Sequence, residues 1–386
     1  MQQRRLTADQ IFTGTELVQD KVLITTGDGR VEALVPAQDV LDDVEYFPGI
    51  LSPGFVNCHC HLELSHMKGK IPEKTGLVDF VFKVVSERQA SPEEIAEAIE
   101  VAEQEMKEGG IVAVGDICNN ASTLVQKSKA NLQYQNFIEA SGWLPSVADA
   151  RFERSYALWQ LFHEQNPLHT SLVPHAPYSV SENLWEKLQP QFRDKVVSIH
   201  NQETLHEDDF FRHGTGDFNR MYALMNLDNS HHLPTQKSSL QSYLHHMENA
   251  ASLLLVHNTF TQADDVAFAK RIEKDHPQLE ISFCLCINAN LYIEDALPPV
   301  EMLRQNGCRM VMGTDSLASN WSLDILDEMR TIKKHFPQLP LAELLTWATR
   351  NGAEALHFDD LGSFDAGKKP GVVNLSTDLQ SVKRIL

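Results

Sequence analysis

The sequence is short of three things: long apolar runs, positive charge and cysteine. No stretch reaches the roughly 18 consecutive apolar residues of a membrane-spanning helix. The start of the chain lacks the apolar centre of a secretory signal, so we expect a cytoplasmic protein. Lysine and arginine total 33 against 53 aspartate and glutamate residues, a formal net charge of -20 at pH 7. Because nucleic acids and anionic membranes bind basic surfaces, this charge excludes both as expected partners.

The six cysteines follow no spacing that indicates a disulfide framework or a zinc knuckle. Cys58 and Cys60 are separated by one residue, as are Cys284 and Cys286, and both pairs lie in or beside strand-like runs. We therefore expect reduced thiols that pack as strand residues and bind no metal.

What the sequence does contain is a regular alternation of strand-like and helix-like segments. Ser91 followed by Pro92 and two glutamates marks the start of one helix, and Ser181 marks another. Eight apolar runs separate the helical segments, at 53–58, 111–115, 134–139, 168–174, 195–200, 252–257, 280–285 and 309–313. Strands that alternate with helices in this way predict an α/β fold, a (β/α)8 TIM-like barrel over residues 53–366.

Two other features depart from this alternation. Residues 1–52 and 367–386 carry short alternating runs broken by turns, and predict a small β-sandwich built from both termini. Residues 204–250 form a long excursion after the fifth expected strand. On the active face of a barrel, such an excursion favours a lid or a substrate-binding loop.

Two histidines end the first expected strand, in the run PGFVNCHCH that begins at Pro53. Residues two apart in an extended chain point to the same face, so His59 and His61 can bind one metal ion. Taken alone, the pair is better explained by two histidines packed at a strand end. His200 and Asp315 reverse that preference, because both also follow strand-like runs and complete a donor set suited to zinc, ferrous iron or manganese.

Two further residues follow strand-like runs. Glu203 lies three residues after His200, where a carboxylate can exchange protons with a metal-activated water and the substrate. Its alternative is a glutamate that starts a helix beside the positive end of the helix dipole. His257 ends the sixth expected strand and can orient the water or polarise the substrate, whereas in isolation it would be a core histidine.

Five motifs occur in order along the chain: PGFVNCHCH from Pro53, PHAPYSVS from Pro174, HNQET from His200, VHNT from Val256 and GTDSLASN from Gly313. Together they resemble the successive signatures of the amidohydrolase superfamily, in particular its cytosine deaminase and chlorohydrolase-like branch. The resemblance spans nearly the whole chain, and residues 362–368 are similar to the family's return to its terminal β-domain.

The resemblance implies one divalent metal ion, zinc first with Fe2+ or Mn2+ as alternatives, held by His59, His61, His200 and Asp315. It makes Glu203 the proton shuttle, with His257 assisting and Asp315 taking a proton from the attacking water. Relatives that bind two metals carry a carboxylated lysine at a strand end, and the run 168–174 contains no lysine. One metal is therefore expected.

Substrate contacts are expected from His175, Asn290 and Ser316. Without the resemblance, His175 would be a histidine in a proline-rich turn. Where relatives have Cys/Asn-Pro-x-Ser-Asn after the seventh strand, this chain has CINAN from Cys286, which keeps the asparagine but neither the proline nor the serine.

The implied activity is hydrolytic deamination of an aminated nitrogen heterocycle, a purine nucleoside such as adenosine or aminodeoxyfutalosine, with release of ammonia. The alternative is hydrolysis of an amide, a cyclic amidine or an aryl chloride by the same apparatus. A relative that serves only as a scaffold would lack ligands or the acid, and this chain keeps them all. The expected partner is a small molecule, and the sequence leaves open the exact substrate, the metal and whether the chain forms a homodimer.

Overall fold

Two four-stranded parallel sheets form the centre of the protein. The computed structural model describes residues 3–40 and 42–386, and its central sheets have the strand orders β6-β7-β8-β9 and β10-β11-β12-β13. The strands are β6 (Phe55–Cys60), β7 (Ile111–Cys118), β8 (Gln133–Ala140), β9 (Thr170–Pro174), β10 (Val196–Asn201), β11 (Ser252–His257), β12 (Glu280–Leu285) and β13 (Arg309–Met312). Each coincides with one of the predicted runs to within three residues at either end.

The two sheets adjoin at both of their edges. The amide of His200 in β10 donates to the carbonyl of His175, which follows β9, at 3.0 Å. At the other edge, the amide of Thr314, just after β13, donates to the carbonyl of His59 in β6, also at 3.0 Å. The strands therefore follow one another in sequence order within and between the two sheets, and the predicted α/β fold is confirmed.

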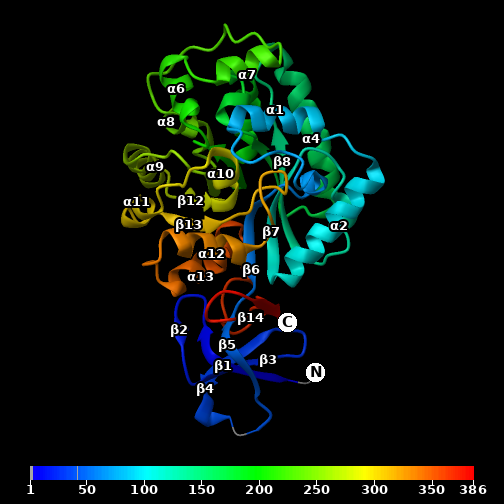
Figure 1. Cartoon of the computed structure of the whole chain (residues 1–386), viewed down its shortest axis with the longest axis vertical. Helices are drawn as coiled ribbons and strands as arrows, with labels where there is room; N and C mark the ends of the chain where they lie inside the picture. The colour runs from blue at the N-terminus through cyan, green and yellow to red at the C-terminus, as the bar shows by residue number, and fades with distance from the viewer. Residues whose placement is uncertain (1–2, 41) are drawn as a thin grey trace.

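Helices lie on both flanks of these strands (Figure 1). Strands buried on both faces need such a cover, because parallel sheets expose little of either face to water. Outside the excursion at 204–250, the helices are α1 (Leu77–Glu87), α2 (Pro92–Glu108), α3 (Leu124–Lys127), α4 (Ala148–Gln165), α5 (Glu182–Leu188), α9 (Ala263–Asp275), α10 (Ile287–Glu294), α11 (Val300–Gln305), α12 (Ile325–His335), α13 (Leu341–Ala348) and α14 (Arg350–Ala355).

The predicted helix starts at Ser91 and Ser181 are both correct. The Ser91 hydroxyl accepts a hydrogen bond from the amide of Glu94 at 3.1 Å, and Pro92 is the first residue of α2. Ser181 precedes α5, but its hydroxyl caps no amide and is buried.

Both termini contribute to one seven-stranded sheet at the opposite end from the excursion (Figure 1). Its strands are β1 (Arg4–Phe12), β2 (Leu17–Val18), β3 (Lys21–Thr25), β4 (Val31–Pro36), β5 (Glu45–Ser52), β14 (Val373–Leu375) and β15 (Val382–Arg384). β14 pairs antiparallel with β5, so the end of the chain is hydrogen-bonded to the segment that leads into β6. The sheet has a small apolar core of its own, which includes Leu6, Leu23 and Leu51. That the termini form a sandwich stays a prediction.

The excursion contains three short α-helices joined by irregular segments. It contains α6 (Leu205–His213), α7 (Phe218–Leu224) and α8 (Ser239–Tyr243), which lie at the far end of the molecule in Figure 1. Phe210, Phe218 and Tyr222 from these helices pack with Trp143 and Tyr178 in an apolar cluster separate from the main core. The excursion is therefore a packed roof over this end of the strands.

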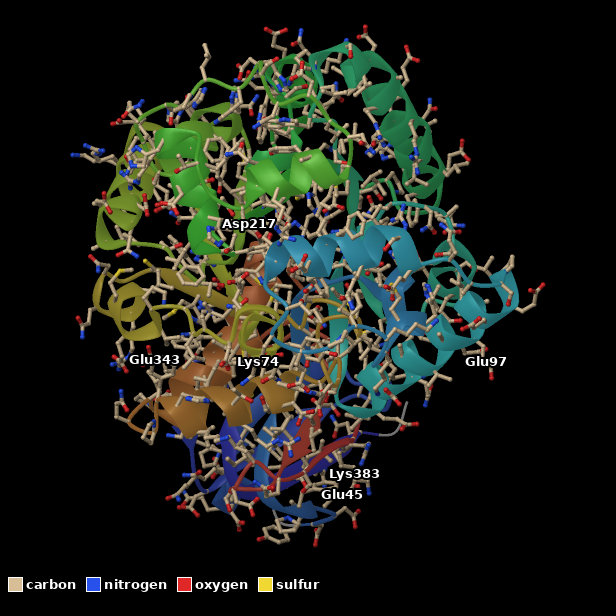
Figure 2. All side chains as sticks on the ribbon, turned by 45° about the horizontal axis from the view of Figure 1, so that its top comes forward. Glu45, Lys74, Glu97, Asp217, Glu343 and Lys383 are labelled. Atoms are coloured by element: carbon tan, nitrogen blue, oxygen red, sulfur yellow. The ribbon has the colours of Figure 1, made fainter. Side chains whose placement is uncertain are left out.

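Many charged side chains lie at the surface, among them Glu97, Glu343 and Lys383 (Figure 2). Within the described residues, no helix is both long and apolar enough to cross a bilayer. All six cysteines are unpaired, and five of them are buried.

Candidate metal centre and cavity

Four predicted residues meet at the carboxyl ends of β6, β10 and β13. The Nε2 atom of His61 lies 3.2 Å from Nε2 of His59 and 3.3 Å from Nε2 of His200. One oxygen of Asp315, Oδ1, lies 3.3 Å from Nε2 of His61 and 3.6 Å from Nε2 of His59. All four side chains are buried, and each has a ligand atom within 4.8 Å of the others. Residues separated by more than two hundred positions in the chain thus present four donors to one point.

The spacing of these donors fits a tetrahedral metal ion. Donors bound to zinc at about 2.0–2.1 Å at the corners of a tetrahedron lie about 3.3 Å apart. The four measured separations run from 3.2 to 3.6 Å. Burial lowers the pKa of His200, and it lowers that of His61 to about 3, so both imidazoles are neutral, the state that binds a metal. The residues present fit a zinc-like cation.

Neighbouring groups fix which atom of His200 and of Asp315 faces the centre. The Nδ1–H of His200 donates to the carbonyl of His175 at 2.7 Å, which leaves Nε2 for a metal. The Ser319 hydroxyl donates to Oδ2 of Asp315 at 2.5 Å, which leaves Oδ1 toward the histidines. Burial acts to raise the pKa of Asp315, but the neighbouring imidazoles of His59, His61 and His257 act in the opposite direction and prevail, so its pKa is lowered.

The backbone at the end of β13 explains the glycine of the motif Gly313-Thr314-Asp315. A Cβ atom on Gly313 would lie 2.9 Å from Cβ of His59 and 2.9 Å from the sulfur of Cys284, closer than real contacts allow. Asp315 has a φ of 58° and His257 a φ of 75°, both in the left-handed region that costs L-residues energy. Strain of this kind persists where the surrounding structure fixes the residue, and here it aims both side chains inward.

Glu203 lies beside this centre, in the turn between β10 and α6. Its Oε1 accepts a hydrogen bond from the Tyr178 hydroxyl at 3.0 Å, and its Oε2 lies 3.5 Å from Nε2 of His257. Burial, followed by the negative charge of Asp315, raises the pKa of Glu203 to about 8, while the hydrogen bond from Tyr178 acts in the opposite direction. A carboxyl with such a pKa can both hold and release a proton near neutral pH.

His257 ends β11. Its Nε2 atom faces Glu203, and its Nδ1 atom is held by Asn290. Nδ1 of His257 lies 2.9 Å from Oδ1 of Asn290, and the Asn290 amide donates to the His257 carbonyl at 3.2 Å. Asn290 is therefore engaged by His257, and it is not among the residues that line the cavity described below. The geometry favours a positioning role for Asn290, and the substrate contact expected of it stays a prediction.

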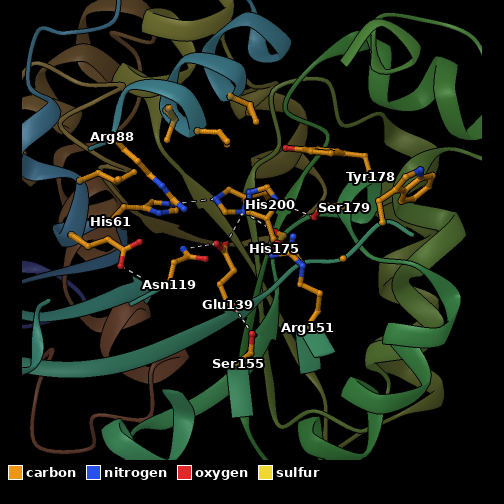
Figure 3. Close-up of a pocket in the computed structure, with 18 of the residues that line it drawn as sticks. His61, Arg88, Asn119, Glu139, Arg151, Ser155, His175, Tyr178, Ser179 and His200 are labelled. Carbon is orange, nitrogen blue, oxygen red and sulfur yellow. Dashed lines mark hydrogen bonds and ion pairs between the residues drawn. The ribbon is translucent and has the colours of Figure 1, made fainter. Parts of the chain in front are cut away.

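A cavity of about 690 Å³ is lined by three of the four donors, His61, His200 and Asp315, and Figure 3 shows His61 and His200 at it. Its volume lies within the roughly 300–1,000 Å³ typical of small-molecule sites. His175 and Ser316, two of the expected substrate contacts, line it together with Glu203 and His257. The remaining wall is largely apolar and comes from α1, α4 and α7: Leu77, Phe80, Val81, Val84, Leu158, Leu161, Met221 and Tyr222.

Two further acidic side chains, Glu63 and Glu139, also line the cavity. Glu63 accepts the amides of Asn119 and Asn120 at 3.0 and 3.2 Å, and the Asn119 amide group donates to Glu139 at 2.8 Å. Burial raises the pKa of Glu63 and of Glu139 to about 7. These groups form a polar floor of the cavity.

Glu139, His175 and His200 also lie close enough to suggest a second cation site. Two observations argue against it. Nδ1 of His200 is used in the bond to the His175 carbonyl, and Nε2 of His200 belongs to the first cluster. The geometry therefore agrees with the expectation of a single metal ion.

Three arginines complete the cavity wall: Arg88, Arg151 and Arg154. Figure 3 shows Arg88 and Arg151 on different sides of the histidines. Over the described part of the chain, no ion pair joins any of the three to an acidic side chain within 4.0 Å, although acids outnumber bases by twenty in the sequence.

Sequence reasoning therefore found the donors and Glu203 but missed several neighbours. Tyr178 and Ser319 lie inside two of the recognised motifs, so a signal for them was present without a role attached. Glu139 lies in the apolar strand β8, Arg88 directly follows α1, and Arg151 and Arg154 lie on α4, where no local pattern distinguishes them.

Two relatives with described activities match most of the chain. An adenosine deaminase from Helicobacter pylori is 28% identical over 331 residues, which are 83% of this chain and 77% of the relative. A 5-methylthioadenosine/S-adenosylhomocysteine deaminase from Teredinibacter turnerae is 25% identical over 394 aligned positions, 95% of this chain and 82% of the relative.

Among solved structures, the aminofutalosine deaminase of Helicobacter pylori in complex with methylthio-coformycin superimposes with a TM-score of 0.80. The match covers 97% of this chain and 92% of that one at 22% identity, and it shows a shared fold. The family model described as the amidohydrolase family matches residues 50–384. The resemblance inferred from the five motifs is thereby confirmed, and the chain belongs to the amidohydrolase family.

Proposed function

We propose that this protein is a metal-dependent hydrolytic deaminase of a purine-nucleoside-like substrate. The observation that carries the proposal is the convergence of His59, His61, His200 and Asp315 beside Glu203 at the floor of a cavity of nucleoside size. The two relatives are an adenosine deaminase and a 5-methylthioadenosine/S-adenosylhomocysteine deaminase, and they support the same substrate class.

The cofactor proposed is one zinc ion held by the three imidazoles and Asp315. Three neutral nitrogen donors and one carboxylate suit zinc, with Fe2+ or Mn2+ as alternatives. When bound, such an ion lowers the pKa of water and so supplies a nucleophile at neutral pH.

The protein's own groups would then move the protons. A C–O bond forms at the carbon that carries the exocyclic amine, and the C–N bond to that amine breaks. Asp315 accepts a proton as water attacks, and Glu203 carries a proton to the leaving nitrogen. Of the two water protons, one leaves with ammonia and the other ends on the ring nitrogen of the product. His257, 3.5 Å from Glu203, would hold the attacking oxygen in line.

Substrate orientation is proposed to come from the lining residues. His175 presents Nε2 to the cavity because its Nδ1 is bonded to the Ser179 hydroxyl at 2.8 Å. Ser316 lies on the wall beside Asp315. The arginines Arg88, Arg151 and Arg154 are proposed to favour nucleosides that carry an anionic group on the 5′ side over adenosine itself, because a guanidinium without a carboxylate partner attracts an anion.

We also propose the domain architecture of the protein. The hydrogen bonds at both edges of the central sheets support a closed (β/α)8 barrel over residues 53–366. The pairing of β14 with β5 supports a second domain made of residues 1–52 and 367–386, a small β-sandwich.

The test combines metal analysis with an ammonia assay. The purified protein should contain close to one zinc per chain and release ammonia from adenosine or from a 5′-substituted adenosine. The panel should extend to pyrimidines, pterins, amides and aryl chlorides. Turnover confined to amides or aryl chlorides would replace deamination by the alternative hydrolysis.

A further inference from the structure

Tyr178 occupies a position that no part of the proposed chemistry yet uses. It lies in the short helical turn Pro177–Ser179 after β9, is 2% exposed and lines the cavity. Its hydroxyl donates to Oε1 of Glu203 at 3.0 Å, and Figure 3 shows its ring extending along the cavity wall. A phenol that only filled space in the wall would not need its one polar atom directed at the carboxyl of Glu203.

The two oxygens of Glu203 are therefore not equivalent. Oε1 is held by Tyr178, whereas Oε2 faces Nε2 of His257 at 3.5 Å. A carboxyl side chain can rotate about its last bond and exchange its two oxygens. The hydrogen bond from Tyr178 limits this rotation to orientations in which one oxygen, whichever of the two it is, accepts from the buried phenol, because any other orientation would leave that hydroxyl without an acceptor, which costs free energy.

Tyr178 is itself held by the roof helix α7. Its ring stacks on Phe218 with centroids 4.3 Å apart and planes inclined at 27°. The Tyr222 hydroxyl donates to the carbonyl of Tyr178 at 2.5 Å, and the Tyr222 ring stacks on Trp143 at 5.0 Å. Thus a continuous set of contacts joins the excursion to the proton-carrying carboxyl.

We propose that Tyr178 is a positioning residue which, braced by α7, holds one oxygen of the Glu203 carboxyl so that the other, which faces His257, exchanges protons with the substrate. The inference rests on the proposed function, since it needs Glu203 to carry protons. It gives the excursion a role in the rate of the reaction besides covering the cavity. A positioned acid–base contributes about 10²–10⁴-fold to rate, so loss of positioning should remove a part of that factor.

The test is the variant Tyr178→Phe, which keeps the ring on Phe218 and removes only the hydroxyl. We expect kcat for the best substrate to fall about 10- to 100-fold with KM within about twofold. The matched control is Tyr134→Phe, which also removes a buried hydroxyl that donates to a glutamate, Glu103, at 2.7 Å, outside the cavity. The control should keep kcat, and both variants should keep their metal.

A second variant covers the case in which Tyr178→Phe fails to fold. Tyr222→Phe frees the carbonyl of Tyr178 and should lower kcat by a smaller factor, again with KM unchanged. Combined with Tyr178→Phe, it should add little further loss, because both changes act on the same carboxyl. Fully multiplicative losses would show that α7 does not act through Tyr178.

The outcomes separate the two proposals. A wild-type protein that releases no ammonia, or a Glu203→Gln variant with full activity, overturns the proposed function. A normal kcat in Tyr178→Phe, or a change confined to KM, overturns the positioning role and leaves the deaminase intact.

Discussion

Replacing Lys127 by methionine should destabilise the protein strongly, although this lysine lies outside the cavity. Its side chain is 5% exposed and its Nζ lies 2.6 Å from Oδ2 of Asp116, which is fully buried. Nζ also donates to the side-chain oxygen of Asn136 at 2.8 Å. In the part of the chain that the structure describes, Asp116 forms its one ion pair with Lys127. Methionine fills a similar volume and leaves that carboxylate without a counter-ion.

The magnitude follows from the burial of both partners. Removing one partner of a buried ion pair costs about 3–5 kcal/mol, because an uncompensated charge stays in a medium that solvates it poorly. Against a total stability of about 5–15 kcal/mol, this is a large fraction. The matched control is Lys129→Met, since Lys129 pairs with Glu100 at 2.8 Å while both side chains are over 40% exposed. An exposed pair contributes about 0–1 kcal/mol.

Urea denaturation followed by tryptophan fluorescence measures both variants, with the metal removed by a chelator so that binding does not mask folding. A difference of less than about 1 kcal/mol between the two variants would refute the argument from burial. A further readout is zinc affinity. Oδ1 of Asp116 accepts the amide of Leu62 at 2.8 Å, directly after His61, so Lys127→Met should also weaken metal binding.

Four further results are expected. Glu203→Gln should keep its zinc and lose about 10²–10⁴-fold in ammonia release, and full turnover would remove Glu203 from the mechanism. Asp315→Asn should reduce the zinc content measured by mass spectrometry, because it removes the anionic ligand; an unchanged content would contradict its role. Arg154→Gln should lower kcat/KM for nucleosides with an anionic 5′ group and spare adenosine, whereas equal losses would exclude anion recognition. Burial raises the pKa of Glu207 and of Glu328 to about 8, so both bind protons that the unfolded chain has released. The free energy of unfolding should fall as pH rises from about 7 to about 8, where the histidines whose pKa burial lowers are already neutral in both states, and a urea midpoint constant over that range would contradict this.

The strands could be predicted because they are buried on both faces. A strand covered on both sides reads as a continuous apolar run, and all eight runs became strands. The largest error in length falls in β7, which continues from the predicted end at 115 through Asp116 to Cys118. In the sequence, a charged residue such as Asp116 indicates the end of a strand. In the structure, the ion pair with Lys127 compensates its buried charge inside the strand.

The metal donors could be predicted for a related reason. In parallel strands the carboxyl ends share one edge, so polar residues that follow separate strands are brought together. No such rule predicts where the helices of the excursion lie. Its helices α6, α7 and α8 have five to nine residues and are too short to be stable alone, so their packing on Trp143 and Tyr178 decides their place.

The roles of neighbouring residues depend on that packing as well. Asn290 was expected to contact the substrate because the resemblance places an asparagine there, yet its amide is committed to His257. Similarly, the motif that contains Tyr178 gives no hint that the hydroxyl reaches Glu203, because the contact depends on the turn after β10.

A common arrangement links the functional side chains of this site. Each has two chemically equivalent or nearly equivalent atoms, one bound by a neighbour and the other directed to the centre: His200, His257, Glu203 and Asp315. An imidazole or carboxylate free at both atoms could present either one. Nδ1 of His59, in contrast, is buried without a hydrogen-bond partner, so the orientation of that ring depends on packing. The neighbouring hydrogen bonds therefore preorganise the centre before a metal or substrate arrives. Motifs can identify the four side chains, but which atom of each performs the chemistry follows only from the groups that hold the other.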